Sequence, residues 1–241
     1  MNRLMDFFYP PRCQLCGSQD NLHYAGQLCT FCAADIRIND NACQICAVPL
    51  GGVKEVSIDH PAVCGHCTKQ LPIFDVCWSP YVYAQPLEWM IHQFKFNARL
   101  HFSPLLSDLI AEKLANYINE ENKPDVIVPM PLHARRLRHR GFNQSYLLIK
   151  PIAKAMNIPI DLTLCERVRD TAHQTGKNAQ QRMRNIKCAF KIKLKKNYRH
   201  VVVFDDVVTT GSSVAELSKT LKQAGVQRVD IWCLARAEKI I

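Results

Sequence analysis

Four C-x-x-C pairs within the first 67 residues constrain the fold of this chain more than any other feature. They are Cys13/Cys16, Cys29/Cys32, Cys43/Cys46 and Cys64/Cys67. Two intervening residues let both thiolates of a pair reach one metal ion, and two pairs complete the tetrahedral shell that Zn²⁺ prefers. The gaps of 12 residues between the first two pairs and 17 between the last two are typical of zinc ribbons. The sequence therefore predicts two zinc ribbons in series.

Two alternatives concern these cysteines. Redox dithiols also use C-x-x-C, although they normally occur singly beside a βαβ pattern. The pairing can be sequential, first with second and third with fourth, or crossed, first with third and second with fourth. His23, His60 and His66 lie nearby and could replace a cysteine ligand. The segment has few long apolar runs, so metal binding has to replace a missing core, and we expect the two zinc ions to be structural.

After about residue 75 the sequence alternates between helical and strand patterns. Apolar residues at helical spacing predict helices at 86–96, 103–118 (with Ser103 as N-cap), 141–156 and 213–225. Short apolar runs predict buried strands at 125–133, 200–206 and 228–236. Strands that alternate with helices form a parallel sheet with right-handed crossovers. We predict two domains, a double zinc ribbon in 1–75 and an α/β domain in 76–241.

Four further cysteines, Cys77, Cys165, Cys188 and Cys233, stand alone among apolar residues, and we expect them to be buried as small hydrophobic side chains. No stretch contains 18 consecutive apolar residues, and the first 13 residues lack the apolar core of a signal peptide. These features predict a cytoplasmic protein without a membrane span, in which clustered cysteines bind metal rather than form disulfides.

The positive charge of the chain is concentrated in one region. The net charge is +10, yet residues 133–200 alone contain 17 Lys and Arg against 3 Asp and Glu. A solvated charged face is the ordinary explanation of such a run. An excess this one-sided favours a polyanionic partner, either a phosphorylated small molecule or nucleic acid.

The stretch VVVFDDVVTTGSSV, residues 201–214, places two aspartates at the end of a buried strand, followed by a hydroxyl-rich loop and a helix. Ligands of parallel sheets bind beyond the carboxyl ends of the strands. The free N–H groups of a helix start favour a phosphate, and Gly211 lets the backbone approach it closely. Asp205 and Asp206 would repel a phosphate but suit the hydroxyls of a ribose. The combination predicts a phosphorylated ribose as the ligand.

Other interpretations of this stretch account for less of it. An ordinary strand-to-helix turn with a capping aspartate explains one carboxylate but not the whole block. The chain has no G-x-x-x-x-G-K-[ST], which excludes a Walker A loop, and no G-x-G-x-x-G, which excludes a dinucleotide fingerprint.

These residues resemble the phosphoribosyl pyrophosphate (PRPP) motif of type I phosphoribosyltransferases. Residues 128–145 (VPMPLHARRLRHRGFNQS) and 167–190 resemble successive blocks of the ComF family, which includes the competence protein ComFC. The double zinc ribbon also resembles that family, and so does the segment HQFKFNARL at 92–100. In this segment Asn97-Ala98 stands where a glycine is common in the family. The resemblance covers essentially the whole chain. It implies an α/β fold, the parallel-sheet type I phosphoribosyltransferase fold, with a small N-terminal zinc-ribbon domain.

The resemblance also implies roles for individual residues. Asp205 and Asp206, the expected catalytic residues, would hold the ribose hydroxyls. The 5′-phosphate would lie on Val208, Thr209, Thr210, Gly211, Ser212 and Ser213. Pyrophosphate and substrate contacts are expected from Lys95, Pro131, Leu132, His133, Arg135, Arg138, Arg140, Asn143 and Gln144. For each arginine taken singly, a solvated surface position is an equal alternative. Residues 167–184 would form a mobile hood over the site or, alternatively, a disordered basic linker.

The implied reaction is the transfer of phosphoribose from PRPP to an acceptor that the sequence does not identify, with Mg²⁺ bridging ribose and pyrophosphate oxygens. The family name implies a part in DNA uptake during natural transformation, with a helicase-like ATPase of competence as a partner. One alternative is a non-catalytic protein that binds single-stranded DNA and keeps the pocket as a sensor or scaffold. Another is a nucleotide-salvage phosphoribosyltransferase unrelated to competence.

Overall fold

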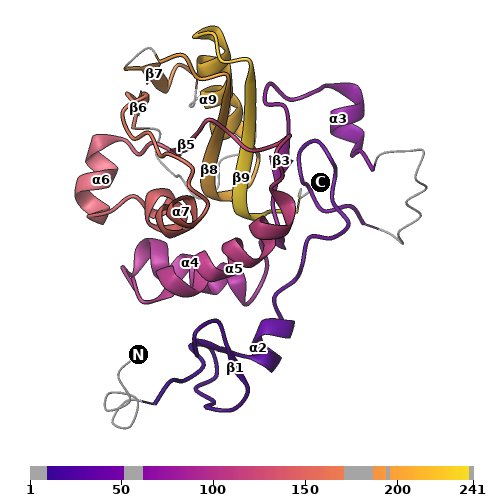
Figure 1. Cartoon of the computed structure of the whole chain (residues 1–241), viewed down its shortest axis with the longest axis vertical. Helices are drawn as coiled ribbons and strands as arrows, with labels where there is room; N and C mark the ends of the chain where they lie inside the picture. The colour runs from indigo at the N-terminus through magenta and orange to yellow at the C-terminus, as the bar shows by residue number, and fades with distance from the viewer. Residues whose placement is uncertain (1–9, 52–61, 171–186, 194–195, 239–241) are drawn as a thin grey trace.

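The computed structural model describes residues 10–51, 62–170, 187–193 and 196–238 (Figure 1). A parallel sheet lies at its centre, in the order β3-β9-β8-β5, and β4 also pairs with β9. The strands are β3 (Cys77–Trp78), β4 (Tyr81–Val82), β5 (Val126–Pro129), β8 (His200–Val208) and β9 (Arg228–Arg236). The parallel sheet predicted from alternating strands and helices is therefore confirmed. The predicted domain division at residue 75 falls just before β3 and stays a prediction.

The parallel strands end at different positions, so that β8 and β9 extend beyond β5 at one edge of the sheet. β8 pairs with β9 along its whole length, from His200 opposite Arg228 to Val208 opposite Arg236. β5 is shorter, and its last pair joins Pro129 to Phe204. Residues 205–208 of β8 consequently extend beyond the end of β5. The strand also runs two residues past the predicted end at Asp206, because its pairing with β9 continues to Val208.

Three helices cover one face of the sheet: α4 (Leu87–Phe96), α5 (Phe102–Tyr117) and α7 (Gln144–Ala155). Phe94, Leu105 and Leu148 from these helices share a core with Val202 and Phe204 of β8. α5 begins at Phe102 with His101 as its N-cap, so the prediction of Ser103 as N-cap was wrong. A turn that leads into the helix is responsible, since Phe102 already donates its N–H to the carbonyl of Arg99, at 3.1 Å. Pro151 lies inside α7 without ending it.

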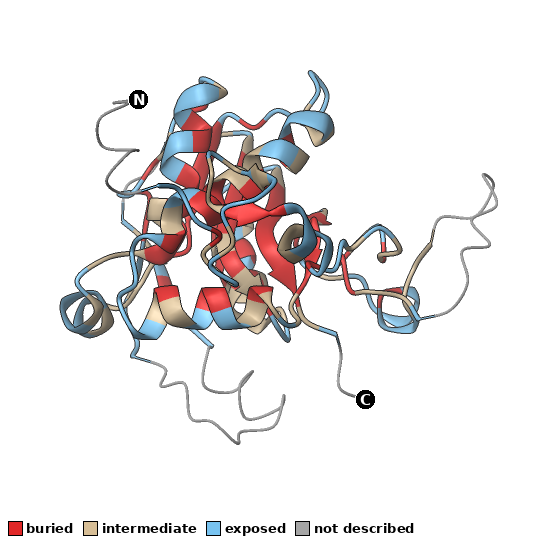
Figure 2. Cartoon of the chain, turned by 90° about the horizontal axis from the view of Figure 1, so that it is seen from below, coloured by how far each residue is buried: buried red, intermediate tan, exposed pale blue. Residues whose placement is uncertain are grey.

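The other face of the sheet is covered by α9 (Ser212–Gln223), whose Val214, Leu217 and Leu221 pack with Val201 and Val203 of β8. Figure 2 shows the buried residues gathered on the sheet and on the inner sides of the helices. A short helix, α6 (Ala134–Arg140), follows β5, and β6 (Cys165–Arg167) pairs antiparallel with β7 (Phe190–Ile192). Among the described residues, no helix is long and apolar enough to cross a bilayer.

The two cysteine-rich segments pack against different sides of the sheet. The first contains β1 (Leu22–His23), β2 (Leu28–Cys29) and α2 (Thr30–Ala34), and it lies beneath α5 in Figure 1. Its Leu28 and Ile36 join the core formed by α4, α5 and α7. The second contains α3 (Gly65–Lys69), lies beside β3, and contributes Ala47 and Val48 to the core on the α9 face.

The isolated cysteines divide into two groups. Cys77, Cys165 and Cys233 are buried, as predicted. Cys188 is exposed, so the prediction for it was wrong. Its backbone has a φ of 54° in the turn before β7, and its N–H donates to Glu216 of α9 at 2.7 Å, which leaves the thiol at the surface.

Candidate ligand site and metal centres

The two aspartates lie at the edge of the sheet where β8 extends beyond β5. Neighbouring side chains of a strand normally point to opposite faces. Both carboxylates nevertheless contact residues of the helical layer formed by α4 and α7. The hydroxyl of Ser145 in α7 donates to Asp205 Oδ1 at 3.0 Å, and Lys95 of α4 forms an ion pair with Asp206. The two acids therefore serve one site rather than two faces.

The charges at this site are largely buried. Asp206 is only 1% exposed. Burial lowers the pKa of Lys95 to about 8, an effect that Asp205 opposes and Arg140 reinforces. Burial also raises the pKa of Asp205, against the influence of Lys95, Ser145 and Arg167. At least three cations thus surround two carboxylates. A net positive, partly dry site of this kind favours a ligand that combines negative charge with hydroxyl groups.

The loop after β8 has the form expected of an anion cradle. Gly211 is the N-cap of α9 with a φ of 78°, a conformation that favours glycine, and no atom lies within 4 Å of the position a Cβ would take. Glycine is therefore favoured at position 211 by its backbone conformation and not by a lack of space for a side chain. α9 begins at Ser212, one residue before the predicted Ser213. The first N–H groups of a helix have no intrahelical partners, and a glycine cap supplies no side chain for them.

The hydroxyls of this loop are accessible. Thr209 and Thr210 are exposed, and Ser212 and Ser213 are half-buried. Thr210 Oγ1 lies 2.9 Å from Ser212 Oγ, so these two hydroxyls already face one another across the loop. Val208, by contrast, is buried as the last residue of β8, and its side chain belongs to the α9 core.

The expected pyrophosphate residues divide into those near the acids and those on the surface. Lys95 and Arg140 influence the pKa of Asp205 and belong to the site. Pro131 and Leu132 lie in the short connection between β5 and α6. His133 is the N-cap of α6, and its Nδ1 accepts the N–H of Arg135 at 3.3 Å. Arg135 and Arg138 are exposed on α6.

Asn143 and Gln144 hold the start of α7 in place. Asn143 is the N-cap of α7, and its side-chain amide donates to the carbonyl of Met130 at 3.1 Å, which links the helix to the end of β5. Gln144 accepts a hydrogen bond from Arg140, whose guanidinium also lies over the ring of Phe96 with 5.5 Å to its centroid. Both residues therefore position Arg140 and the loop after β5.

Three residues of this region were not singled out from the sequence. Ser145 supports Asp205, and its only sequence signal is its place at the end of the 128–145 block. Arg167 ends β6, and burial and the nearby Arg136 lower its pKa to about 10, although Asp205 opposes the shift. Arg236 ends β9 and is buried, an unusual end for an apolar strand and the one cue that the sequence offered. Residues 171–184 of the predicted hood lie outside the described residues.

The eight paired cysteines form two separate clusters. One contains Cys13, Cys16, Cys29 and Cys32, the other Cys43, Cys46, Cys64 and Cys67, and in each the sulfurs all lie within 4.8 Å of one another. The Sγ atoms of Cys16 and Cys29 are 3.6 Å apart, as are those of Cys46 and Cys64. Tetrahedral zinc with bonds of about 2.3 Å places its sulfurs about 3.8 Å apart. Both clusters fit zinc, the pairing is sequential, and the crossed alternative is wrong.

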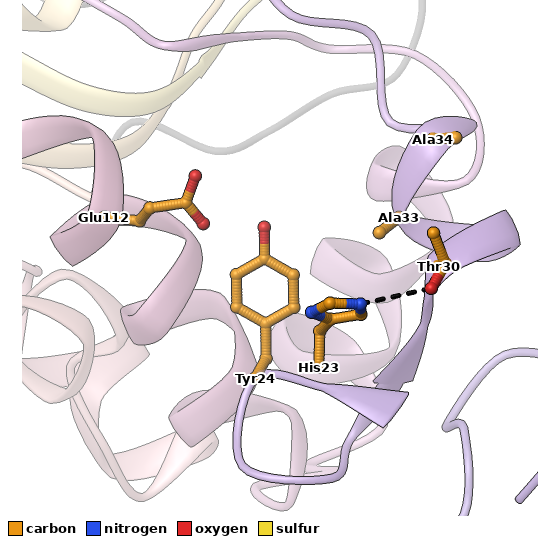
Figure 3. Close-up of a pocket in the computed structure, with 6 residues that line it drawn as sticks. All are labelled: His23, Tyr24, Thr30, Ala33, Ala34 and Glu112. Atoms are coloured by element: carbon orange, nitrogen blue, oxygen red, sulfur yellow. Dashed lines mark hydrogen bonds between the residues drawn. The ribbon is translucent and has the colours of Figure 1, made fainter. Parts of the chain in front are cut away.

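Two of the nearby histidines, His23 and His66, do not enter these clusters. His23 Nε2 lies 3.1 Å from Thr30 Oγ1, His66 is exposed on α3, and His60 lies outside the described residues. All twelve cysteines are free of disulfides. Figure 3 shows a hollow of about 510 Å³ where the first ribbon meets α5, lined by His23, Tyr24, Thr30, Ala33, Ala34 and Glu112. Burial and the nearby Glu112 raise the pKa of Tyr24 to about 12, so its hydroxyl stays protonated.

Known proteins match the whole length of this architecture. The family profile of the double zinc ribbon domain matches residues 4–68, and that of the phosphoribosyl transferase domain matches residues 98–239. The DNA utilization protein YhgH of Salmonella typhi is 37% identical over 230 residues, which cover 94% of this chain and 97% of that protein.

Two competence proteins are also similar. Competence protein F of Haemophilus influenzae is 35% identical over 236 residues, covering 95% of this chain and 99% of that protein. Competence protein ComFC of Streptococcus pneumoniae is 26% identical over 157 residues, covering 65% and 66%. These matches agree with the two cysteine clusters, the parallel sheet and the motif at the end of β8. The chain therefore belongs to the ComF family and combines a double zinc ribbon with a phosphoribosyltransferase domain.

Proposed function

We propose that this protein binds PRPP, or another 5-phosphorylated ribose, at the end of β8 and transfers its phosphoribosyl group to an acceptor. The observation that supports this most is a pair of carboxylates, the buried Asp206 and the half-buried Asp205, set among Lys95, Arg140 and Arg167 beside the loop that caps α9. The acids suit ribose hydroxyls, the loop suits a phosphate, and the cations suit the remaining anionic group. PRPP carries all three parts on one molecule.

Each part of the site has a role in this proposal. Asp205 and Asp206 hold the ribose hydroxyls, while the loop 208–213 receives the 5′-phosphate. Lys95, Arg140 and Arg167 face the pyrophosphate and stabilise the charge that builds on it as its bond to the anomeric carbon breaks. The acceptor forms its new bond at the same carbon. By fixing the ribose between the loop and the cations, the site aligns that carbon for attack.

Magnesium enters the proposal together with the ligand. Mg²⁺ in proteins usually binds through one or two carboxylates together with substrate phosphates and water. Asp205 and Asp206 supply carboxylates of that kind, and the ribose and pyrophosphate oxygens of PRPP would complete the shell. When bound, Mg²⁺ would offset the negative charge of the leaving pyrophosphate.

We further propose that the protein acts in the uptake or use of DNA, as the names of its relatives state for them. The surface next to the site favours single-stranded DNA as a partner. Phe96 is 59% exposed with Arg140 over its ring, and Arg135 and Arg138 are exposed on the adjacent helix α6. Exposed aromatic rings stack with bases while guanidinium groups contact phosphates. A helicase-like competence ATPase as partner and a cytoplasmic location belong to the same proposal.

Calorimetry with the full-length, zinc-loaded protein tests the ligand. PRPP with Mg²⁺ should release heat with the wild type and none with the double variant Asp205→Asn, Asp206→Asn. Absence of binding by the wild type to PRPP and to ribose 5-phosphate would overturn the proposal. Release of pyrophosphate across a panel of bases and amines then decides whether turnover occurs.

A second measurement separates the transferase from a DNA-binding module. Fluorescence anisotropy with a labelled single strand should show binding that weakens steeply as salt is raised. A purely DNA-binding function predicts that the double aspartate variant binds the strand as the wild type does while the wild type fails to bind PRPP. Binding of both ligands by the wild type supports a shared role.

A further inference from the structure

One buried side chain joins the second cysteine cluster to the loop after β8. Arg236, at the end of β9, is 2% exposed. Its Nε–H donates to the carbonyl of Cys46 at 3.0 Å. Its Nη1 donates to the carbonyl of Val208 at 2.9 Å and to that of Thr209, and it also reaches Ala237 at 3.2 Å. The same guanidinium therefore contacts a residue of the second metal centre and the first two residues of the loop.

The planarity of the peptide group turns these contacts into a constraint on the loop. In a trans peptide, the C=O of one residue and the N–H of the next point in opposite directions within a single plane. Because Arg236 draws the carbonyls of Val208 and Thr209 toward itself, the N–H groups of Thr209 and Thr210 are turned away from it. The guanidinium is planar with fixed donor directions, so it holds both carbonyls at once. Arg236 thereby sets the direction in which the N–H groups of Thr209 and Thr210, at the start of the loop, point.

The other end of the guanidinium depends on the second cysteine cluster. Cys46 is followed by Ala47 with a φ of 53°, and Ala47 donates its N–H to the carbonyl of Cys43 at 2.8 Å, which closes the tight turn between the two cysteines. Cys64 also donates its backbone N–H to the sulfur of Cys43, at 3.3 Å. Four thiolates that repel one another have no reason to keep this arrangement without a cation between them. Zinc held by these four cysteines would therefore fix the Cys46 carbonyl that Arg236 contacts.

The first cysteine cluster has no equivalent link in the described part of the chain. Its Cys13 and Cys29 pack into the core with α4 and α5, on the other side of the sheet. Arg37, which follows the first ribbon in the sequence, forms an exposed ion pair with Glu238 at 2.8 Å. The two metal centres are thus unequal in their connection to the ligand site.

We propose that Arg236 is a positioning residue that makes phosphate binding at the loop 208–213 depend on zinc in the second cluster and not on zinc in the first. The inference rests on the proposed function, because it concerns the same loop. If the proposal holds, phosphate binding is regulated through the second cluster. Loss of its zinc or oxidation of its cysteines would weaken phosphate binding without any change in the acids or the cations that face the ligand.

Hydrogen exchange of the loop tests the link without any ligand. In the full-length protein, the variant Cys64→Ser, Cys67→Ser should lose one zinc and speed amide exchange in residues 208–213 about tenfold. The variant Cys13→Ser, Cys16→Ser should lose the other zinc and leave exchange in the loop as in the wild type. Arg236→Met should speed exchange while both zinc ions remain, and Arg37→Met serves as the matched arginine control. Equal loop exchange in all four variants would overturn the proposal.

Binding of inorganic phosphate and ribose 5-phosphate completes the test. Affinity should fall about tenfold or more in Arg236→Met and in the second-cluster variant, with a smaller loss in Arg236→Lys. If Arg236→Met does not fold, stepwise chelation of the wild type followed by zinc addition gives the same comparison reversibly. Should the wild type bind neither compound while its loop exchange still follows the second zinc, the proposed function fails and the link stands. Should it bind both with an affinity indifferent to the second zinc, the link fails and the proposed function stands.

Discussion

Lys95, in the last turn of α4, forms an ion pair with Asp206 in β8. The carboxylate proposed for a ribose hydroxyl is therefore already neutralised by a side chain proposed for the pyrophosphate. A ligand that brings a hydroxyl to the aspartate and an anion to the lysine replaces this pair with two interactions of its own. The ion pair compensates the charge of Asp206, and the proposed binding of PRPP has to replace this pair with contacts to the ligand.

The first prediction concerns the pH dependence of PRPP binding. Since the pKa of Lys95 is about 8, the ammonium is present below pH 8 and is lost as the pH rises through that value. The affinity for PRPP should fall by only about twofold between pH 7 and 8 and then by up to about tenfold for each further pH unit. Calorimetry between pH 7 and 9.5 checks it, in a range where the phosphate itself, with a second pKa of about 6, no longer titrates.

The matched variant for this prediction is Lys95→Arg. A guanidinium stays protonated throughout this range. The decrease in PRPP affinity above pH 8 should therefore disappear in this variant, even if its affinity at pH 7 is lower than that of the wild type. A wild-type profile that stays flat to pH 9.5 would contradict the assignment of Lys95 to the anion.

The second prediction concerns Ser145, which is fully buried and donates to Asp205. Ser145→Ala removes a donor from a carboxylate whose pKa burial already raises, so Asp205 becomes harder to ionise. The net loss for one such hydrogen bond is about 1 kcal/mol, which corresponds to roughly fivefold weaker PRPP binding. Ser107→Ala is the control, because Ser107 is also buried but donates to the carbonyl of Leu148, at 2.9 Å, between α5 and α7. It should cost similar stability and leave the PRPP affinity unchanged.

The sequence predicts the parts of this site that are encoded locally. The cysteine spacing identifies the ribbons, and the run from Val201 to Val214 identifies the strand, the acids, the loop and the helix, because each of these depends on neighbours a few residues away. The boundaries of α5, β8 and α9 differ from the predictions by only one or two residues. The predictions were wrong by more at two places: β5 ends at Pro129 rather than at residue 133, and α7 begins at Gln144 rather than at residue 141, after its N-cap Asn143.

The parts that the sequence does not predict depend on contacts between distant residues. Ser145 meets Asp205 across 60 positions, and Arg236 meets Cys46 across 190. Hydroxyl and guanidinium groups at such positions look the same in sequence whether they face solvent or a carbonyl group. The sequential pairing of the cysteines is of the same kind, since both pairings satisfy the spacing and only the fold distinguishes them.

The third prediction concerns Asp161, which holds together the segment between α7 and β8. Its carboxylate accepts hydrogen bonds from Thr163, Leu164, Lys196 and Tyr198. These donors outweigh the effect of burial and lower its pKa to about 2. Asp161→Asn should reduce the free energy of unfolding by about 2–3 kcal/mol at pH 7, because the four donors lose the charged acceptor that this buried carboxylate provides. Urea unfolding of the zinc-loaded protein measures it.

The acid dependence of Asp161 follows from the sign of its shift. A folded-state pKa below the unfolded value means that the stabilisation is fully present above about pH 5 and is lost as the pH falls through 4 toward 2. The wild type should therefore lose its advantage over Asp161→Asn in this range. Asp108→Asn is the control, since burial raises the pKa of Asp108 and its removal should be neutral or stabilising at pH 7. An advantage that persists unchanged to pH 2 would show that the carboxylate charge is not responsible.

The fourth prediction concerns Ala98, which belongs to the pair Asn97-Ala98 where the resemblance to the ComF family leads us to expect a glycine. Ala98 lies between α4 and α5 with a φ of 48°, in the left-handed region that costs a residue with a Cβ about 1–2 kcal/mol. Ala98→Gly removes this strain but adds freedom to the unfolded chain, worth about 0.4–1 kcal/mol. The net stabilisation should be about 0.5–1 kcal/mol, which raises the melting temperature by roughly 2 °C in a protein of this size. Calorimetric melting checks the sign of this change in melting temperature.

The control for Ala98→Gly is Ala111→Gly in the interior of α5. Ala111 has a right-handed helical backbone, so the same exchange should cost about 1 kcal/mol of stability there. If both exchanges lower the melting temperature equally, the strain at Ala98 is absent.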